Sequence, residues 1–531
     1  MYPIFQQTEH YTVTEQLLPM SDGICLYTRC TVPTNAEKCP AVFIRTPYDA
    51  ARKGIPCEID RDVEAVFAAN GYAVVRQHCR GSGDSEGFCL PYSEKERTDG
   101  LDTLERIRKM PFYNGEIFLW GGSYLASVHY LYLDAAPADI KGAVFFVQTD
   151  RMYFHKYRNG CVYDPIGNTN WYLDRIRRKY PEQDRSQIHK RPYLDIMPRA
   201  IGTDIPRFTD MQRNDQYNDF WKADHRTHFA ENLKLPVLFL DGWYDFYLGG
   251  MCSMWQRLSD ETRKKSAFLI GPWGHSTKTA RNCPYPLPDG DIPVDYAVQW
   301  FESIRQKTQY PYAQTGKINY YSIGGGKWSV ADTFSPTQQE KTLYFHKDLT
   351  LGAEPSSDNG HITYRYDPDH APGCFRHNSL FPGHEPNSVP GVVTFLSEPL
   401  EAELSCYGPV RWHMTVSSDC DDTAFFFRVS FVEDGTSYNL TQVITSLSHI
   451  APDCHAGMPV TIDLDTTPIA FTLKKGSRIR VDIASHSDIF APHANIKGHW
   501  AEVTETKIAH NTLHLKNAHI TLPADPRVSP E

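Results

Sequence analysis

The most constraining feature of this chain is the apolar run Ile117–Trp120, which passes directly into Gly121, Gly122 and Ser123 and then into a helix-forming stretch. A strand of this kind needs both faces buried, which predicts a central strand of a parallel sheet. Small residues tolerate the strained backbone of a sharp strand-to-helix turn, and the first N–H groups of the next helix point back at the serine. The pattern predicts a nucleophile elbow at Ser123, although an isolated Gly-x-Ser motif is more often an ordinary turn.

Two further strand ends supply the acid and the base that a serine nucleophile needs. The buried run Pro236–Leu240 leads to Asp245, and the run Ala267–Ile270 leads to His275. Because the carboxyl ends of parallel strands meet at one edge of a sheet, both side chains are expected beside Ser123. Taken singly, the aspartate would be a turn residue and the histidine a packed core residue. The order serine, aspartate, histidine at three strand ends favours a catalytic triad.

Strands and helices alternate around this elbow, which indicates a mostly parallel sheet. The expected elements are a hairpin over Tyr11–Pro33, strands at 41–48 and 72–79, helices near Arg61–Asn70 and Lys95–Lys109, and a strand at Lys141–Val147.

The pattern then changes twice. Residues 149–232 are rich in Tyr, Arg, Asp and His, with helix-like stretches such as Trp171–Tyr180, and we expect them to form a helical cap over Ser123. From residue 316 onward, short alternating segments separated by Gly, Pro, Asp and Ser are typical of a β-sandwich. These segments are Ile318–Ile323, Lys341–His346, Val410–Val416, Ala424–Val432 and Arg478–Ile483. The expected domains are an α/β core in residues 1–148 and 233–315, the cap in 149–232 and an all-β domain in 316–531.

Composition agrees with a large enzyme. The 531 residues suggest about three domains, and 41% hydrophobic residues can fill more than one core. The 54 basic and 64 acidic residues give a net charge of −10, which favours neither nucleic acid nor an anionic membrane as a partner. The N-terminal residues lack the pattern of a signal peptide, and thirteen cysteines without metal-ligand spacing fit a reducing compartment. We expect a cytoplasmic protein.

Motifs for other chemistry are weak. In the segment Gly81–Gly87, Glu86 occupies the third glycine position of a dinucleotide fingerprint. The loop Gly324–Lys327 lacks the spacing of a phosphate loop, and His225 and His228 have no third zinc ligand in view. We therefore expect no metal and no cofactor.

Several motifs occur together in one order. They are Arg45–Asp49, Gly71–Val75 with Arg80–Gly87, Trp120–Tyr124, Gly242–Asp245 and Gly271–His275, followed by Ser417–Asp419 with Asp421–Thr423, Tyr438–Thr441 and Lys474–Arg480. On these motifs the chain resembles the bacterial cocaine esterase and X-prolyl dipeptidyl peptidase family, the CocE/NonD serine hydrolases. The resemblance covers nearly the whole chain.

The resemblance implies an α/β-hydrolase core with an inserted helical cap and a C-terminal jelly roll. It makes Ser123 the nucleophile, His275 the general base and Asp245 its orienting acid. It also implies an oxyanion hole formed by the Tyr48 hydroxyl and the Tyr124 backbone N–H, which is sound chemistry because both can reach one oxygen. Without the resemblance, Tyr48 would be interpreted as a ring at the edge of the core.

Two residues depart from the family pattern. Ala126 stands where glycine is usual, which widens the approach of helix and strand slightly. Cys79 stands where an aspartate is common before Arg80, which puts a carboxylate partner of that arginine in doubt.

Two classes of function remain open. One is hydrolysis of a carboxylic ester of a small or aromatic acyl group, with α-amino-acid esters or amides and X-prolyl peptides as alternatives. The other is a non-catalytic carbohydrate-binding protein, since unrelated jelly rolls bind sugars.

Within the hydrolase class, the sequence favours an uncharged ester. The family's X-prolyl peptidases usually carry a long extra N-terminal domain, whereas this chain enters the core almost at once. The family's amino-ester hydrolases place acidic residues after the catalytic aspartate, where this chain has Phe246 and Tyr247. We expect these two rings, with Trp171 of the cap, to line the acyl pocket. The expected substrate is a small-molecule ester or a short peptide-like molecule, and the sequence leaves a homodimer open. The cap carboxylates that could still meet a substrate cation are Asp164, Asp174 and Asp210.

Overall fold

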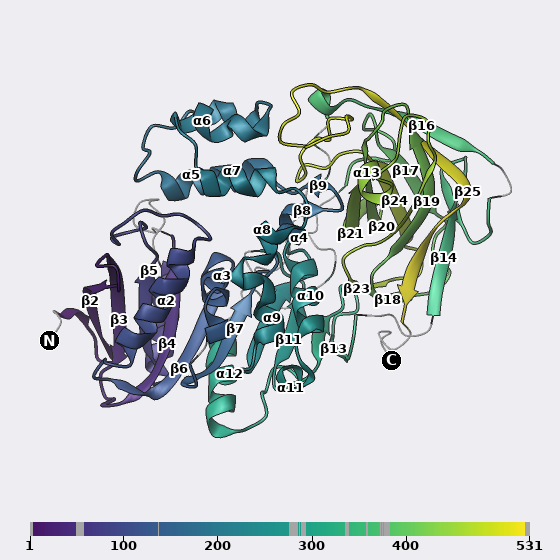
Figure 1. The fold of residues 1–531 in the computed structure, drawn as a ribbon. Coiled ribbons are helices and arrows are strands. Elements are labelled where there is room, and N and C mark those ends of the chain that lie inside the picture. Colours follow the sequence, from purple (N-terminus) through teal and green to yellow (C-terminus); the bar gives the residue numbers. More distant parts are fainter. Residues whose placement is uncertain are drawn as a thin grey trace.

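The computed structural model describes residues 4–48, 58–135, 137–275, 285, 287, 294–334, 339–356, 359–371, 373, 375 and 383–525. Figure 1 shows an α/β core, a group of helices above one end of it, and a C-terminal all-β unit beside both. Asp49 and Ser276, next to predicted site residues, lie outside the described residues.

The core is built on one twisted sheet. Its strand order is β1-β2-β3-β5-β4-β6-β7-β10-β11-β12-β13. The strands from β5 to β12 pair in parallel, and the remaining strands add antiparallel pairs at the two edges. In chain order the strands are β1 Ile4–Gln7, β2 Tyr11–Pro19, β3 Cys25–Pro33, β4 Cys39–Thr46, β5 Ala73–His78, β6 Tyr113–Gly122, β7 Ile140–Phe146, β10 Val237–Gly242, β11 Ala267–Gly271, β12 Ile318–Tyr321 and β13 Trp328–Ala331.

Helices cover both faces of this sheet, as successive strand residues require. Val42 and Val74 face a cluster that includes Phe301 of α12 (Val294–Gln306), and α1 (Glu58–Ala69) contributes to the same face. Phe43 and Val75 face the opposite cluster. That second face is covered by α2 (Glu94–Ile107), α3 (Tyr124–Tyr130) and α10 (Leu248–Arg257), while α11 (Asp260–Lys264) leads into β11. The central strands are therefore buried on both sides, and their apolar runs were readable for this reason.

The chain between β7 and β10 is largely helical. Figure 1 shows α5, α6 and α7 above the core, with the β8–β9 hairpin beside the C-terminal unit. The elements are α4 Met152–Lys156, β8 Tyr157–Arg158, β9 Cys161–Val162, α5 Pro165–Ile176, η3 Arg185–His189, η4 Tyr193–Asp195, α6 Ile196–Ile201, α7 Pro206–Arg213, α8 Asp219–Lys222, η5 His225–His228 and α9 Phe229–Asn232. This insertion is called the cap below.

The C-terminal unit is a twelve-stranded, nearly closed sheet whose strands pair antiparallel except for β15 and β17. Its long strand β25 pairs with β14, β16, β18 and β19. The elements are β14 Gln339–Phe345, β15 Thr350–Gly352, β16 His361–Tyr366, η6 Pro368–His370, β17 Val393–Ser397, β18 Leu404–Gly408, β19 Arg411–Ser418, β20 Ala424–Glu433, β21 Thr436–Ser446, α13 Leu447–Ile450, β22 Val460–Asp465, β23 Ile469–Leu473, β24 Arg478–Ala484 and β25 Ala509–Ala524.

The predicted fold class, an α/β-hydrolase core with a helical cap and a C-terminal jelly roll, is confirmed by this architecture. One segment was assigned to the wrong sheet. The run Ile318–Ile323 was expected in the β-sandwich, but its strand β12 pairs in parallel with β11 and extends the core sheet. A short alternating run looks the same at the edge of either sheet, so periodicity alone could not separate the two.

The cap and the core both bond to the C-terminal unit. The N–H of Ala491 donates to Val162 O at 2.8 Å, which joins the β8–β9 hairpin to that unit. From the core, Ile323 bridges Phe471 of β23, and the Tyr320 and Tyr407 rings stack at 4.2 Å. Within the described chain, no helix combines the length and apolar character needed to cross a bilayer.

Candidate active site

Ser123 lies on the sharp turn between β6 and α3. Its φ of 53° and ψ of −127° are strained for a residue with a side chain. Its N–H donates to Phe146 O on β7 at 3.0 Å, which fixes the turn to the sheet. The two preceding glycines have no room for a side chain: a Cβ would lie 2.5 Å from Leu125 O at Gly121 and 1.9 Å from the Phe146 ring at Gly122. The sequence folds into an elbow here because only glycine fits before the serine.

The structure brings Ser123, His275 and Asp245 into one hydrogen-bonded chain. His275 Nε2 lies 3.1 Å from Ser123 Oγ, and His275 Nδ1 lies 2.7 Å from Asp245 Oδ2. The other Asp245 oxygen accepts a hydrogen bond from the Tyr247 N–H at 2.6 Å, and the carboxylate is fully buried. A neutral imidazole held this way donates from Nδ1 and accepts the serine proton at Nε2, which is the geometry of base-assisted nucleophilic attack.

A second buried carboxyl group, Asp241, lies at the same strand end. One of its oxygens accepts from the Gly242 N–H at 2.7 Å, and the other has no hydrogen-bond partner among the described residues. Burial raises the pKa of Asp241 well above its usual range, and the nearby charge of Asp245 adds to the effect. These surroundings favour the protonated form of Asp241, whereas Asp245 has an imidazole as its hydrogen-bond partner. Its position directly after the strand run was the one signal for it in the sequence.

Tyr48 follows β4 and points its phenol at the nucleophile. Burial raises the pKa of Tyr48, while hydrogen bonds with Trp171 and Ser123 and the charge of Arg175 partly oppose the rise. The Arg175 guanidinium lies 4.9 Å from the centre of the Tyr48 ring. A phenol that stays protonated and contacts Ser123 can donate to an oxygen that develops charge there.

Tyr124 is anchored by its side chain, which leaves its backbone N–H at the start of α3. The Tyr124 hydroxyl donates to the buried Glu96 carboxylate, and the Tyr92 N–H donates to Tyr124 Oη at 3.1 Å. The Tyr124 N–H is in the first turn of the helix and has no acceptor among the described residues. Tyr48 and Tyr124 thus present two donors near Ser123.

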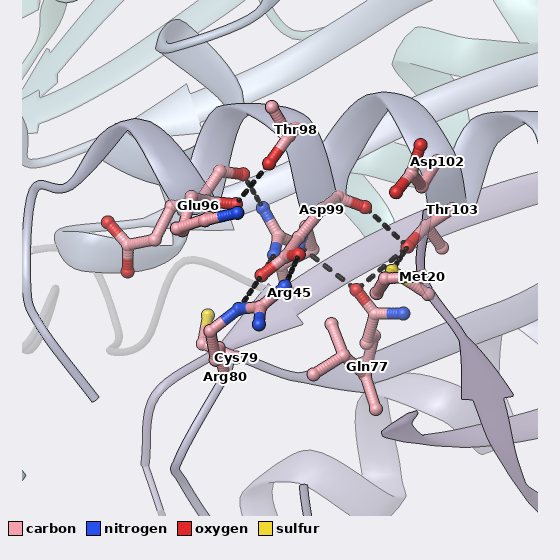
Figure 2. A network of polar contacts seen from close by, with 12 residues as sticks. Met20, Arg45, Gln77, Cys79, Arg80, Glu96, Thr98, Asp99, Asp102 and Thr103 are labelled. Carbon is pink, nitrogen blue, oxygen red and sulfur yellow. Dashed lines mark hydrogen bonds and ion pairs between the residues drawn. The ribbon is translucent and has the colours of Figure 1, made fainter. Parts of the chain in front are cut away.

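Glu96 belongs to a buried polar network that the sequence did not reveal. Figure 2 shows this network on α2, where Arg45 and Arg80 approach Asp99 and Arg45 also reaches Gln77. Arg45 Nε donates to Gln77 Oε1 at 3.2 Å, and Arg80 Nε donates to Asp99 Oδ2 at 3.0 Å. Burial raises the pKa of Glu96 to about 7, although the hydrogen bond from Tyr124 opposes the rise. The network ties β4, which leads to Tyr48, to the helix beneath Tyr124.

The two departures from the family pattern lie close to this network. Arg80 forms ion pairs with Asp99 and Asp22. It therefore has carboxylate partners although the buried Cys79 replaces the aspartate that is common at that position. Ala126 is fully buried in α3, and its methyl group is accommodated between helix and sheet.

Aromatic rings surround the triad. Trp171 of α5 lies 5.1 Å from Tyr124 and 5.9 Å from Tyr92, measured between ring centres. The Phe246 ring stacks on His275 at 4.2 Å, and Tyr247 lies 5.7 Å from the same imidazole. All the predicted site residues therefore gather at one end of the core sheet. His155 of α4, whose ring lies 4.1 Å from Tyr247, was not predicted and carries no motif.

The three cap carboxylates are already engaged. Asp164 accepts from the Gly167 N–H at 2.9 Å at the start of α5, and Asp174 pairs with Arg185 at 2.6 Å. Asp210 lies 3.9 Å from Arg213 on the same helix. The carboxylates near His225 are those of Glu94 and Asp134, and the described residues contain no cluster of three or more metal-ligating side chains.

Comparison with known proteins finds two matching family models. The model described as X-Pro dipeptidyl-peptidase (S15 family) matches residues 22–277, and the one described as X-Pro dipeptidyl-peptidase C-terminal non-catalytic domain matches residues 312–521. Among curated proteins, cocaine esterase of Rhodococcus sp. (strain MB1 Bresler) is 23% identical, with 90% of this chain and 91% of that protein covered.

Solved structures share the whole fold. An aminopeptidase from a marine sediment Thaumarchaeota archaeon superposes with a TM-score of 0.83 at 17% identity, covering 98% of both chains. An α-amino acid ester hydrolase gives 0.77 at 19% identity, again over 98% of both chains. A CocE/NonD family hydrolase from Staphylococcus aureus gives 0.69 at 16% identity, covering 97% of this chain and 93% of that one.

Proposed function

Since the chain belongs to the serine hydrolase family that includes the S15 X-Pro dipeptidyl-peptidases and cocaine esterase, we propose that it hydrolyses carboxylic esters of uncharged acyl groups through an acyl-enzyme intermediate. The observation that carries the proposal is the hydrogen-bonded chain from Ser123 through His275 to Asp245. The comparisons give no support to a non-catalytic carbohydrate-binding role.

The geometry supports a two-step reaction. His275 Nε2 takes the proton of Ser123 Oγ as that oxygen attacks the ester carbonyl carbon, and the carbonyl oxygen becomes an oxyanion. Tyr48 O–H and Tyr124 N–H donate to this oxyanion. The imidazolium then gives its proton to the leaving alcohol oxygen as the carbon–oxygen bond breaks. In the second step His275 deprotonates a water molecule, which attacks the acyl-enzyme and releases the carboxylic acid and Ser123.

The charges around the site favour an uncharged acyl group. Two cations near the aromatic walls are Arg175 over Tyr48 and Arg226, whose guanidinium lies 4.3 Å from the Tyr92 ring centre. The carboxylates on hand are committed to His275, to the start of α5, to arginines or, for Glu96, to the Tyr124 hydroxyl and the Tyr92 N–H. An ammonium group on the substrate would meet guanidinium charges and no free carboxylate among the described residues, which costs several kcal/mol when the cation is buried.

The first test is nucleophile identity. Ser123→Ala removes the nucleophile without adding bulk, so turnover of a neutral ester should vanish while the melting temperature stays near that of the wild type. A fluorophosphonate should label the wild-type serine and not the variant. Substantial activity in Ser123→Ala would show that another residue attacks the ester.

The second test is acyl charge. A neutral acyl ester and the α-amino-acyl ester of equal chain length are compared with one leaving group, and each rate is corrected by the alkaline hydrolysis rate of that ester. We expect the higher kcat/KM for the neutral ester at neutral pH. A clear preference for the amino ester would instead favour an α-amino-acid ester hydrolase or a dipeptidyl peptidase.

A further inference from the structure

A cavity of about 630 Å³ lies where the cap, α10 and the C-terminal unit meet. Its lining includes Asp245, Phe246 and Tyr247, but neither Ser123 nor His275. The cavity therefore adjoins the triad without containing the nucleophile. Phe246 and Tyr247, the two rings expected to line the acyl pocket, form one wall of this space, and the ester-cleavage mechanism assigns no role to the part beyond them.

The charged side chains that line this cavity differ in whether they have a partner of opposite charge. Arg151 forms an ion pair with Glu231 at 2.6 Å, and Asp465 forms one with Arg411 at 3.2 Å. Asp245 is bound to His275. Among the charged lining residues, Arg158 alone has no oppositely charged side chain of the described chain within ion-pair distance.

The contacts of Arg158 are all to neutral groups. Its Nη2 donates to Phe246 O and lies 3.3 Å from His155 Nδ1, and its guanidinium lies 4.1 Å from the Tyr163 ring centre. Burial lowers the pKa of His155 well below its usual range, so that imidazole is neutral. Burial also lowers the pKa of Arg158 itself, and the charge of Asp245, which is hydrogen-bonded to His275, opposes this fall only in part. An anion that reached this guanidinium would relieve the cost.

The first turn of α10 adds donors to the same cavity. Gly249 and Gly250 both line it, and their N–H groups have no acceptor among the described residues. At Gly249 a Cβ would meet nothing closer than Thr467 at 3.8 Å, so this backbone is open to a ligand. The positive end of the helix dipole, like the Arg158 guanidinium, favours a negatively charged ligand.

Aromatic side chains form much of the remaining wall, among them Tyr153, Phe246 and Phe490. They suit an apolar body attached to an anionic group. We propose that this cavity is a second ligand site for a small carboxylate with an aromatic or aliphatic body, anchored by Arg158.

The test measures benzoate binding by calorimetry on full-length protein whose Ser123 has been blocked with a small fluorophosphonate. Benzoate should bind the blocked protein, and the neutral analogue benzamide should bind at least tenfold more weakly. Arg158→Met should weaken benzoate binding by about 10- to 100-fold, the usual effect of losing a charge-assisted hydrogen bond, with little effect on benzamide. Arg151→Met is the matched control: it lines the same cavity but is already paired, so the benzoate Kd should change by less than about threefold.

Equal benzoate affinity in wild type and Arg158→Met would overturn the proposal. Binding that disappears when Ser123 is blocked would also overturn it, since benzoate would then occupy the catalytic pocket. If the serine resists the reagent, the esterase proposal fails, but the comparison of Arg158→Met with Arg151→Met still tests the cavity.

A measurement on wild-type crystals covers the case in which Arg158→Met does not fold. After soaking with 4-bromobenzoate, the anomalous bromine signal should lie in the cavity, with the carboxylate at Arg158. A signal at Ser123 alone would contradict the second site.

Discussion

At the scale of single residues, two aspartates at one strand end have different hydrogen-bond partners. Asp241 and Asp245 are both buried, yet only Asp245 has a hydrogen-bonded imidazole to stabilise its charge. The unpartnered oxygen of Asp241 and its raised pKa both disfavour a charge on this carboxyl group. Position next to a catalytic strand end is therefore not enough to make a carboxyl group catalytic.

Paired substitutions test this difference. Asp245→Asn should lower kcat by roughly 10³- to 10⁴-fold, because an amide can no longer fix the imidazole tautomer or stabilise the imidazolium. Asp241→Asn keeps an oxygen that can accept from the Gly242 N–H and leaves the bond between Asp245 and His275 in place, so kcat should change only a few-fold. Steady-state hydrolysis of one neutral ester, with circular dichroism as the folding control, provides the comparison. A loss of similar size in both variants would refute the assignment.

Tyr48 is the second residue whose role can be isolated. Tyr48→Phe removes the proposed oxyanion donor and should lower kcat about 10²- to 10³-fold, with little change in KM. Tyr92→Phe is the control, because Tyr92 lies in the same aromatic group around Trp171 but does not contact the serine. A large rise in KM with kcat preserved would make Tyr48 a substrate-binding residue instead.

At the scale of elements, α2 supports the oxyanion hole from below. It carries Glu96, which accepts a hydrogen bond from the Tyr124 hydroxyl. It also carries Asp99, which forms ion pairs with Arg45 and Arg80 (Figure 2). A carboxyl group buried this deeply gives the fold a pH dependence that can be measured.

That dependence has a definite sign. Because the pKa of Glu96 is raised to about 7 in the folded protein, the native state keeps a proton that the unfolded chain loses at lower pH. The free energy of unfolding should therefore fall as the pH rises from about 4.5 to about 7. Glu96→Gln keeps an acceptor for Tyr124 and removes this titration, so its stability relative to wild type should rise by on the order of 2–3 kcal/mol between pH 5 and pH 8.

Urea unfolding at several pH values measures this gap. Glu94→Gln, which removes an exposed carboxylate from the same helix, is the control variant. A constant difference between Glu96→Gln and wild type across the pH range would mean that Glu96 does not titrate there.

Elements and site residues differed in how far the sequence could predict them. The strands β4, β6, β10 and β11 were predictable because strands buried on both faces are continuous apolar runs. The predicted triad followed from the order of polar residues at their ends. The network of Arg45, Glu96 and Asp99 was not predictable, since its pairings join residues far apart in the chain and no local pattern marks a buried charge. Arg158 was missed for a similar reason, because only the folded structure reveals that no carboxylate of the described residues lies within ion-pair distance of it.

At the scale of the whole molecule, the cap, core and C-terminal unit share their interfaces. One apolar cluster contains Phe239 of the core sheet together with Trp412 and Phe471 of the C-terminal unit. Backbone bonds join Val162 of the cap to Ala491, and Ile323 to Ala470. Continuous apolar packing of this kind couples domains that would otherwise move independently.

We therefore expect one cooperative unfolding transition. Differential scanning calorimetry should show a single peak, and tryptophan fluorescence and circular dichroism should give the same midpoint. A chain that ends after residue 334 should be poorly soluble, because it exposes the apolar surface that the C-terminal unit covers. Two resolved transitions, or a stable truncated protein, would show that the core folds alone.

The long strand β25 gives this architecture a consequence for protein synthesis. It pairs with β14, β16, β18 and β19, yet it is made after all of them. During synthesis on the ribosome, each of these four strands keeps one edge unpaired until its part of β25 has emerged. The predicted triad residues leave the exit tunnel much earlier, so a nascent chain carries them before the wall that contains Phe490 exists. A premature stop codon even shortly before residue 509 would thus leave four strands without β25 as a partner and not merely remove the last one.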